Sequence, residues 1–275
     1  MQQIQDMLSQ LTQHDPIGRV SRDDALREDL AGLRLFDPPL VRVASASDPL
    51  FERLREPQAV GPLMRLPSDW LPEARCVVSY FFPMSQRVRE SNRTGAYASD
   101  EWFHARIQGQ AFIVAAGKRL CEFLRGQGFQ AICPAAEPDF EAHFFEEGDL
   151  SGSFRSNWSE RHVAYACGLG TFSLSKGVIT ERGTAGRFGS IVTDADLPVT
   201  PRPYEDLCEY CSGCGSCIAR CPAGAISIET GKDNLSCYGA MVESRSIHPG
   251  YVGCGKCQVG VPCETGIPTR RAQAV

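Results

Sequence analysis

The sequence lacks the features that mark an exported or membrane-anchored protein. None of its apolar runs approaches the length of about eighteen residues that crosses a bilayer. The first twenty residues, MQQIQDMLSQLTQHDPIGRV, contain no basic stretch followed by an apolar one and no twin-arginine pair. The sequence therefore predicts a cytoplasmic protein without a membrane-spanning segment.

A surplus of positive charge is also missing. The chain has 28 Lys and Arg against 33 Asp and Glu, which gives a net charge of -5. Nucleic-acid-binding proteins usually carry a basic face, so the composition argues against a nucleic-acid partner. The glycine-containing stretch GLGTFSLSKG is not a dinucleotide fingerprint, because it lacks G-x-G-x-x-G between a strand and a helix.

Cysteine, in contrast, is abundant and unevenly placed. The chain has 13 cysteines, and nine of them fall between positions 208 and 263. The pattern C-x2-C-x2-C-x3-C followed by proline is the one by which bacterial ferredoxins hold cubane iron–sulfur clusters. Here it consists of Cys211, Cys214, Cys217, Cys221 and Pro222. Glycines at positions 213 and 215 let the backbone curl, so three of these sulfurs can reach one small cluster.

The remaining cysteines predict a second cluster. In two-cluster ferredoxins the fourth cysteine of such a run ligates the other cluster. Cys221 is therefore predicted to point away from its neighbours, with Pro222 starting the helix that carries it off. The predicted first set of ligands is Cys211, Cys214, Cys217 and Cys263, and the predicted second set is Cys221, Cys237, Cys254 and Cys257.

Three alternatives to this assignment stay open. Two residues separate Cys208 from Cys211, so a shifted frame would use Cys208 as the ligand in place of Cys211. Zinc binds pairs of C-x2-C motifs, although zinc sites seldom use eight cysteines with a C-x3-C-P ending. Disulfides belong to oxidising compartments, and the missing leader argues against them.

The residues before the cysteines predict an α/β core preceded by a wrapping segment. Proline breaks divide residues 1–70, with short helices predicted at LSQLTQH and DPLFERLRE and a short strand at PPLVRVAS. The run RCVVSYFFP predicts a buried strand. A long amphipathic helix is predicted over residues 101–127, and FQAICPAA is predicted to follow as a strand. The predicted apolar face of that helix consists of Ile107, Ala111, Val114, Leu120 and Leu124.

The segment before the proline-rich linker predicts one more helix and a hairpin. The helix runs from Ser159, its predicted cap, to Cys167 and ends at Gly168. The strands GVITER and RFGSIVTD are predicted to pair around Gly183. The predicted organisation is a wrapping segment (1–70), an α/β cofactor domain (71–200) and a two-cluster domain (201–275).

Several of these segments resemble the epoxyqueuosine reductase and reductive dehalogenase superfamily over roughly residues 70–268. They are GLG at 168–170, ITERGTAGRFGSIVTD, the proline linker, CYGAMVE and GCGKCQ. The resemblance implies an α/β (α+β) nitroreductase-like domain that holds a cobalamin, followed by a small bacterial-ferredoxin-like domain with two 4Fe-4S clusters. It also implies that the eight cysteines are cluster ligands and that SNWSERHVAYACGLG lines the cofactor and substrate cavity.

The other candidate site residues lie in or just after that segment. Arg161 and Tyr165 share one helical face and are the candidate catalytic residues, Arg161 to hold a carboxylate or phosphate and Tyr165 to donate a proton. The candidate cofactor-binding residues are Arg155, Trp158, Gly168, Gly170 and Lys176. The alternatives are a solvated helix face, a salt bridge between Arg161 and Glu160, and a tyrosine packed in the core.

Together the residues and the resemblance predict an iron–sulfur oxidoreductase. Electrons from a ferredoxin or flavodoxin would cross two clusters, reach a cofactor and reduce a small organic molecule. Cobalamin is the cofactor that the resemblance implies, and flavin mononucleotide is the alternative, since nitroreductase-like folds elsewhere bind it. None of the five histidines stands in a D-x-H-x-x-G cobalamin motif. The second hypothesis is an electron-transfer or corrinoid-handling protein with no substrate of its own.

Overall fold

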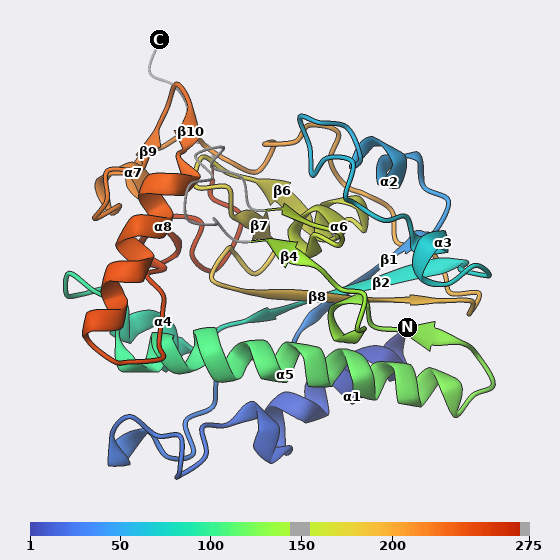
Figure 1. The fold of residues 1–275 in the computed structure, drawn as a ribbon, viewed down its shortest axis with the longest axis horizontal. Coiled ribbons are helices and arrows are strands. Elements are labelled where there is room, and N and C mark those ends of the chain that lie inside the picture. The colour runs from blue at the N-terminus through green and yellow to red at the C-terminus, as the bar shows by residue number, and fades with distance from the viewer. Residues whose placement is uncertain (144–154, 270–275) are drawn as a thin grey trace.

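Figure 1 shows the computed structural model, which describes residues 1–143 and 155–269. A four-stranded sheet lies at the centre, with the long helix α5 (Asp100–Arg125) along one face and the short helix α6 (Glu160–Ala166) on the other. The cysteine-rich segment packs beside the amino-terminal end of α5. Within the described ranges no helix is long and apolar enough to cross a membrane.

The sheet is antiparallel throughout. Its strands lie in the order β1 (Leu40–Ser45), β2 (Cys76–Pro83), β8 (Gly186–Thr193), β3 (Ala131–Ile132). β2 and β8 pair over eight residues, with Val78 opposite Ile191. The prediction of a mixed helix-and-strand fold is confirmed, and the antiparallel pairing makes it an α+β arrangement.

Strand β2 is buried along its whole length because both faces of the sheet are covered. Val78, Tyr80 and Phe82 belong to the core on the α5 side, whereas Val77 and Phe81 pack with residues of and after α6. Successive side chains of a strand point to opposite faces, so burial on both faces requires a continuous apolar run rather than an alternating one. The strand predicted from RCVVSYFFP is confirmed.

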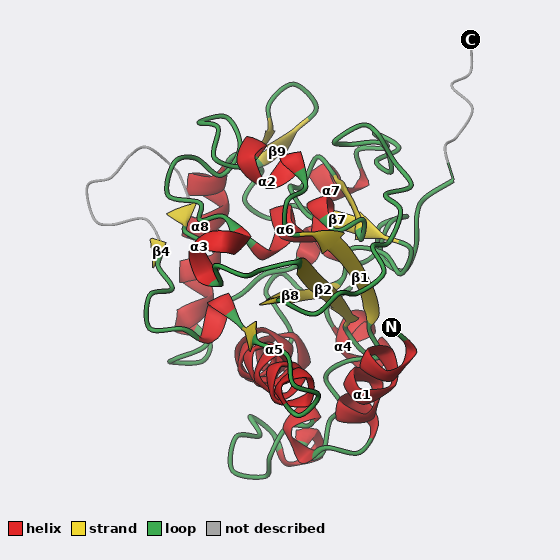
Figure 2. Cartoon of the chain, turned by 90° about the vertical axis from the view of Figure 1, so that its right-hand side faces the viewer, coloured by secondary structure: helices red, strands yellow, loops and turns green. Residues whose placement is uncertain are grey.

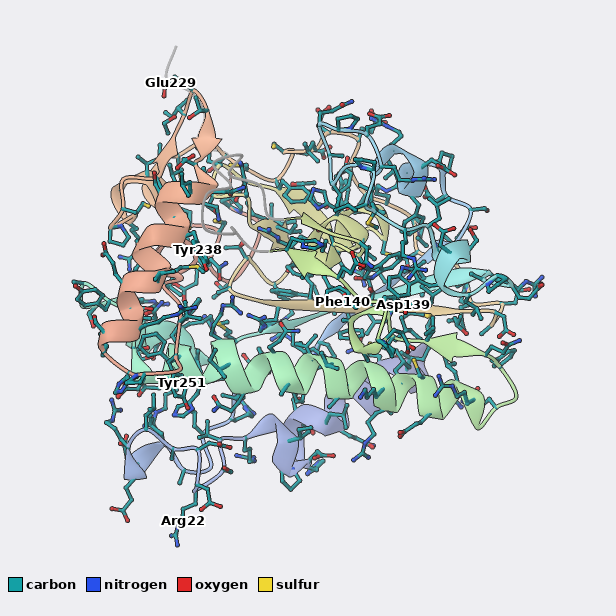
Figure 3. All side chains as sticks on the ribbon, viewed as in Figure 1. Arg22, Asp139, Phe140, Glu229, Tyr238 and Tyr251 are labelled. Atoms are coloured by element: carbon teal, nitrogen blue, oxygen red, sulfur yellow. The ribbon has the colours of Figure 1, made fainter. Side chains whose placement is uncertain are left out.

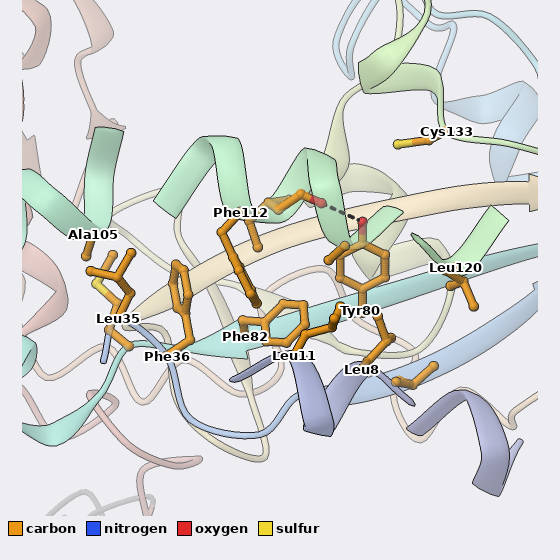
Figure 4. Close-up of a cluster of buried hydrophobic side chains, with 14 of the residues drawn as sticks. Leu8, Leu11, Leu35, Phe36, Tyr80, Phe82, Ala105, Phe112, Leu120 and Cys133 are labelled. Atoms are coloured by element: carbon orange, nitrogen blue, oxygen red, sulfur yellow. Dashed lines mark hydrogen bonds between the residues drawn. The ribbon is translucent and has the colours of Figure 1, made fainter. Parts of the chain in front are cut away.

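The core on the α5 side is rich in aromatic residues (Figure 4). The Tyr80 hydroxyl donates to the Ile113 carbonyl at 3.0 Å, and Phe82 meets Phe112 edge to face with 4.9 Å between ring centres. Helix α1 (Gln2–Gln13) lies beside α5 and adds Leu8 and Leu11 to this core (Figures 2 and 4). Residues 1–70 thus supply a helix and the edge strand β1 to the sheet domain, and the helix predicted at LSQLTQH and the strand at PPLVRVAS are both present.

Several short helices, turns and strands also lie in the described part of residues 1–156. The helices are α2 (Pro49–Arg53), α3 (Pro67–Trp70) and α4 (Gln86–Ser91). Single 3-10 turns occur at Pro16–Gly18, Glu28–Leu30 and Pro134–Ala136. The two-residue strands β4 (Ala142–His143) and β5 (Arg155–Ser156) pair with each other.

Helix α5 confirms the long predicted helix but corrects its apolar face. Ala111 is exposed, and the burial that was predicted there falls one position on, at Phe112 and Ile113. The strand predicted from FQAICPAA is present only as the two residues of β3. Helix α6 ends as predicted at a left-handed Gly168, but Ser159 bonds the His162 ring at 2.7 Å instead of capping the backbone.

The hairpin predicted from GVITER and RFGSIVTD is wrong. Strand β7 (Val178–Thr180) pairs with β6 (Gly170–Phe172), while β8 pairs with β2 and β3. A single bridge joins Thr180 to Gly183. The physical reason is that β8 lies inside the sheet, where both of its edges already have partners.

The cysteine-rich segment contains little regular structure. It holds the short helix α7 (Ser216–Ala219), the hairpin β9 (Ile226–Ser227) and β10 (Gly231–Lys232), helix α8 (Asn234–Glu243), and 3-10 turns at Ser244–Ser246 and Lys256–Gln258. No helix begins at Pro222, which corrects that prediction: a turn follows it, and α8 starts twelve residues later. The chain turns directly after Cys221, so Cys221 is separated from the preceding cysteines without a helix.

Candidate functional site

The first predicted set of cysteines lies around one pocket beside the β6–β7 hairpin. Cys211, Cys214, Cys217 and Cys263 all line it. Burial, together with the nearby thiols of the other three cysteines, raises the pKa of the Cys263 thiol to about 12. The other described lining residues are uncharged, among them Ser173, Leu174, Ser175 and Ile179.

The second predicted set lies around a separate cavity of about 150 Å³. Burial, together with the smaller effect of the thiols of Cys254, Cys237 and Cys221, raises the pKa of Cys257 to about 12. These four cysteines form one wall of the cavity. The other wall comes from the sheet domain and consists of Met84, Trp102, Arg106, Gly186 and Arg187.

The structure thus brings together the same two groups of four that the spacing predicted. In the described part of the chain no three His, Cys, Asp or Glu side chains converge closely enough to hold one metal ion. A cubane cluster instead distributes its four cysteine ligands over separate iron atoms.

Cys208 stands apart from both sets. It is exposed and is not among the residues that line the pocket of the first set, whereas Cys211 is. The two are neighbours, since the Cys211 amide donates to the Cys208 carbonyl at 3.0 Å. The geometry favours Cys211 over the shifted frame.

Three cations lie close to the second set. Lys256 is only 3% exposed and donates to the carbonyls of Asn92 and Thr94 at 3.0 and 2.6 Å. Its charge opposes the rise in the pKa of Cys254, which burial causes. Lys232 acts in the same sense on Cys257.

The third cation is Arg161, one of the two candidate catalytic residues. Burial lowers the pKa of its guanidinium, and the thiols of Cys237 and Cys257 oppose that shift, so Arg161 lies beside the second set. Arg161 donates to the carbonyl of Lys176 at 2.7 Å. The side chain is also solvent-accessible, so it sits in a recess and not in the core.

Tyr165, the other candidate, has different neighbours. Its ring stacks on Tyr204 at 5.2 Å, and its carbonyl accepts a hydrogen bond from the Tyr204 hydroxyl at 2.7 Å. Burial raises the pKa of Tyr165, and Cys208 is among the groups close enough to raise it further. Although four residues apart on one helix, Arg161 and Tyr165 are therefore oriented toward different cysteines.

Trp158 is a core residue in the structure. It is 1% exposed and packs between Phe51 and Trp70, and its indole nitrogen donates to Ser190 at 2.8 Å. The Ser190 hydroxyl donates in turn to Glu160 at 2.6 Å. This contact takes the place of the salt bridge between Glu160 and Arg161 that sequence reasoning kept as an alternative.

The remaining candidates have structural reasons to be where they are. A Cβ added at Gly170 would lie 1.9 Å from the Ile179 carbonyl oxygen, so β6 and β7 pair closely only with glycine there. Gly168 has a φ of 89° and ends α6. Lys176 is exposed in the β6–β7 turn with a φ of 55°, and its own carbonyl receives Arg161. Arg155 lies in β5, and its side chain is outside the described part of the structure.

Sequence reasoning missed Arg106, Arg187, Lys232 and Lys256. These residues come from α5, from β8, from β10 and from the 3-10 turn at Lys256–Gln258. No spacing rule connects them, because only the docking of the cysteine-rich segment on α5 brings Arg106, Arg187 and Lys232 around one cavity, with Lys256 beside Cys254. The C-x2-C motif around Lys256 was the one available signal.

Comparisons with known proteins add the evolutionary context. No family model matches the chain. It is 24% identical over 219 residues to the epoxyqueuosine reductase of Bacillus cereus, a match that covers 73% of this chain and 51% of that protein. A catabolic reductive dehalogenase in complex with 3-bromo-4-hydroxybenzoic acid aligns with a TM-score of 0.50 and 16% identity, over 84% of this chain and 30% of that one. The resemblance to this superfamily is supported.

A third match is a structure that was solved with RNA. An epoxyqueuosine reductase with an epoxyqueuosine-modified tRNA stem loop aligns with a TM-score of 0.49 and 19% identity, over 84% of this chain and 62% of that one. The chain spans about half the length of the curated relative it matches. The activities of these proteins are therefore not assigned to this chain.

Proposed function

We propose that this chain is an iron–sulfur reductase that passes electrons through two 4Fe-4S clusters toward a small organic substrate. The observation that carries the proposal is the gathering of eight cysteines into two separate sets of four. Four thiolates are the usual ligands of such a cluster. The first cluster would be held by Cys211, Cys214, Cys217 and Cys263, and the second by Cys221, Cys237, Cys254 and Cys257.

The exposure of the two sets supports a direction for the electrons. Cys214 of the first set is exposed, so a ferredoxin or flavodoxin can approach that cluster from solvent. The second set faces the sheet domain across the 150 Å³ cavity. An electron would therefore enter at the first set and leave at the second, which is the one closest to Arg161.

The identity of the electron acceptor is a separate question. Cobalamin is the cofactor that the sequence resemblance implies, and the curated relative gives flavin no support. Ligand pockets for drug-sized molecules usually measure about 300–1,000 Å³, and the cavity beside the second set is smaller. This 150 Å³ cavity is therefore too small for a corrin ring, and no step is assigned to one.

The small cavity favours one alternative. A protein that carries electrons to another protein, or that handles a corrinoid without a substrate of its own, needs the two clusters but no large internal pocket. In this alternative the electrons follow the same two-cluster path as in the reductase. They then leave the second cluster for another protein or a corrinoid instead of a substrate.

The test is anaerobic reconstitution with iron and sulfide, followed by titration with cobalamin and with flavin mononucleotide. About eight irons per chain are expected if both clusters form. The reduced protein is then given 3-bromo-4-hydroxybenzoic acid and, separately, an epoxyqueuosine-containing tRNA stem loop, because the similar structures are described with these compounds. Loss of bromide or formation of queuosine supports the reductase. Eight irons with neither cofactor bound and neither product formed supports the electron carrier, and zinc or about four irons refutes the two-cluster proposal.

A further inference from the structure

The turn that follows helix α4 joins the sheet domain to the loops that carry the cysteines of both sets. This turn consists of residues 92–94, directly after the last residue of α4, and is called the α4 turn below. Its partners in the cysteine-rich segment are three charged residues, and each of them adjoins a cysteine in the sequence. These partners are Arg220, Lys256 and Glu264.

Asn92 holds the loop of the second set through both its side chain and its backbone. It is fully buried, and its side-chain amide donates to the Cys254 carbonyl at 2.9 Å. Its side-chain oxygen accepts a hydrogen bond from the Ser99 amide at 3.1 Å. The Lys256 ammonium donates to the carbonyls of Asn92 and Thr94 at 3.0 and 2.6 Å. The second-set loop is therefore held at a cysteine and at the lysine two positions later.

Arg93 holds the loop of the first set through a paired ion contact. Its Nε and Nη2 atoms donate to the two carboxylate oxygens of Glu264 at 3.1 and 2.7 Å. Glu264 directly follows Cys263 and is only 4% exposed. It also accepts hydrogen bonds from the Gly260 amide at 2.6 Å and from Arg89 at 3.2 Å. Paired contacts between a guanidinium and a carboxylate fix direction as well as distance, so the position of Glu264 relative to the α4 turn is well defined.

Arg220 completes the network, because it comes from the run that supplies ligands to both sets. It lies between Cys217 of the first set and Cys221 of the second. Its guanidinium donates to the Arg93 carbonyl at 2.9 Å and to the Lys256 carbonyl at 3.0 Å. One side chain thus binds the α4 turn and the second-set loop at the same time. Each contact in this network uses a backbone group or a neighbouring side chain, which leaves the cysteine sulfurs free to bind iron.

We propose that the α4 turn is a positioning element that fixes the distance and orientation between the two clusters. Hydrogen bonds to the residues around metal ligands orient those ligands, and a site is held precisely when rigid parts of the scaffold support it. The rate of electron transfer between two clusters falls steeply with their separation, so a fixed separation matters to a chain that passes electrons from one to the other. The proposal rests on the proposed function, because it requires both clusters.

The experiment compares the magnetic interaction between the two reduced clusters in the iron-loaded wild type and in variants of the α4 turn. Two reduced clusters split each other's electron paramagnetic resonance signal by an amount that depends on their distance and orientation. Arg93→Gln removes the paired contact with Glu264, and the Arg93 side chain is 43% exposed, so this variant should fold. It should keep about eight irons and show a changed splitting. Arg93→Lys keeps the charge without the paired geometry and should change the splitting as well, which separates positioning from a purely electrostatic effect.

Asn92→Ala tests the side of the second set. It removes the hydrogen bond to the Cys254 carbonyl and should also change the splitting at an unchanged iron content. Thermal unfolding shows whether this variant is folded, since Asn92 is buried. If it is not, Arg220→Gln takes its place, because Arg220 is only half-buried and its guanidinium binds both loops.

Two variants outside the network serve as matched controls. Tyr251→Phe removes the hydrogen bond that Gln108 of α5 donates to the Tyr251 hydroxyl at 3.0 Å, a contact that also joins the sheet domain to the cysteine-rich segment (Figure 3). Arg87→Gln removes an ion pair of 2.7 Å between α4 itself and Asp29. Both controls should keep the wild-type splitting, whatever their effect on thermal stability.

The outcomes separate the positioning role from the proposed function. If the variants of the α4 turn lower the melting temperature but keep the wild-type splitting, the turn only stabilises the fold and the proposal is refuted. It is equally refuted if Arg93→Lys matches the wild type, if the controls change the splitting as much as the turn variants do, or if the two clusters of the wild type do not interact. A wild-type chain with about four irons or none refutes the proposed function itself, and the positioning role with it.

Discussion

The two sets of cysteines are alike in number and unlike in surroundings. The pocket of the first set is lined in its described part by uncharged residues and opens to solvent at Cys214. The second set is enclosed and has Lys232, Lys256 and Arg161 beside it. The reduction potential of an iron–sulfur cluster depends on net charge, hydrogen bonds to sulfur and solvent exposure. Two clusters that each have four cysteine ligands can therefore differ in reduction potential.

Two effects compete at the second set. Enclosure disfavours the extra negative charge of a reduced cluster, whereas nearby cations favour it. A unit charge about 4 Å away contributes on the order of 4 kcal/mol at the effective dielectric constant of a protein surface, and three cations are present. We expect the cations to win, so the second cluster should have the higher potential and receive electrons from the first.

The largest expected effect comes from removing a ligand. Cys263→Ser should lose the first cluster and Cys257→Ser the second, so the iron content of each variant should fall from about eight to about four. Electron paramagnetic resonance of the reduced variants would show which signal disappears. Cys208→Ser is the control and should keep both signals. Full retention of both clusters in Cys263→Ser would reject the assignment.

Substitution of two glycines should also disturb the two clusters one at a time, without removing a cysteine ligand. A Cβ at Gly255 would lie 1.9 Å from the Trp102 ring, and one at Gly183 would lie 2.2 Å from the Glu264 carbonyl oxygen, next to Cys263. Each alanine variant should destabilise the fold by about 1–3 kcal/mol or more through overpacking. Gly255→Ala should disturb the second cluster and Gly183→Ala the first, as measured by thermal unfolding and cluster spectra.

Gly250→Ala is the matched control for this pair. Gly250 also has a positive φ, but a Cβ there would meet no atom within 4 Å. It reports the backbone strain alone, so equal destabilisation by all three alanines would show that packing on Trp102 and Glu264 is not the cause.

The buried carboxyl group of Glu160 predicts a pH dependence of stability. The Oε1 atom of Glu160 is buried without a partner, as is Nε of Arg187, but a carboxyl group can become neutral and a guanidinium does so far less readily. Burial raises the pKa of Glu160 from 4.5 to about 8. Between these values the folded chain holds a proton that the unfolded chain has lost, so stability should decrease as pH rises from about 4.5 to about 8.

Glu160→Gln keeps the group neutral at every pH and should remove this decrease. The variant should therefore gain stability over the wild type at pH 9 by on the order of a few kcal/mol, while the two are close at pH 4.5. Urea unfolding at both pH values, followed by the fluorescence of the neighbouring Trp158, measures the difference. An identical pH dependence in both proteins would contradict the neutral, buried state of Glu160.

The smallest expected effect is a shift in the reduction potential of the second cluster. Lys232→Gln should lower the potential of the second cluster by on the order of 50 mV, because a half-buried cation is partly screened by solvent. The potential of the first cluster should not change. Redox titration followed by electron paramagnetic resonance measures both, with Lys118→Gln on the exposed side of α5 as the control. A second cluster whose potential lies below that of the first would overturn the proposed direction of electron flow.

The sequence predicted those features that depend on neighbours along the chain. Cysteine spacing grouped the two sets, since a C-x2-C loop places its thiols together whatever surrounds it. The run at β2 predicted a strand buried on both faces for a similar reason. The phase of α5 was harder, because its buried face is chosen by two partners, the sheet and α1, and Ala111 fell between them.

Features that depend on tertiary docking could not be predicted. The partner of β8 is β2, more than a hundred residues earlier, so the nearby β7 was the wrong choice. Tyr165 is directed by Tyr204, which returns from the linker to stack on it. Arg106 and Arg187 are separated by 81 positions, and only the fold makes them neighbours.

Helix α5 contacts the cysteine-rich segment, the 150 Å³ cavity and the sheet through residues spaced along two of its turns. Trp102 contacts the Cys254–Cys257 loop at Gly255, Arg106 reaches the cavity, and Gly109 lies under Arg187 and Phe36. Seven residues span about 10 Å and two turns of an α-helix, and each added residue rotates the remainder of the helix by about 100°. Inserting one residue between Trp102 and Gly109 would thus rotate one of these contacts by about 100° away from its partner. Relatives that keep the same electron path should vary in the composition of this stretch but not in its length.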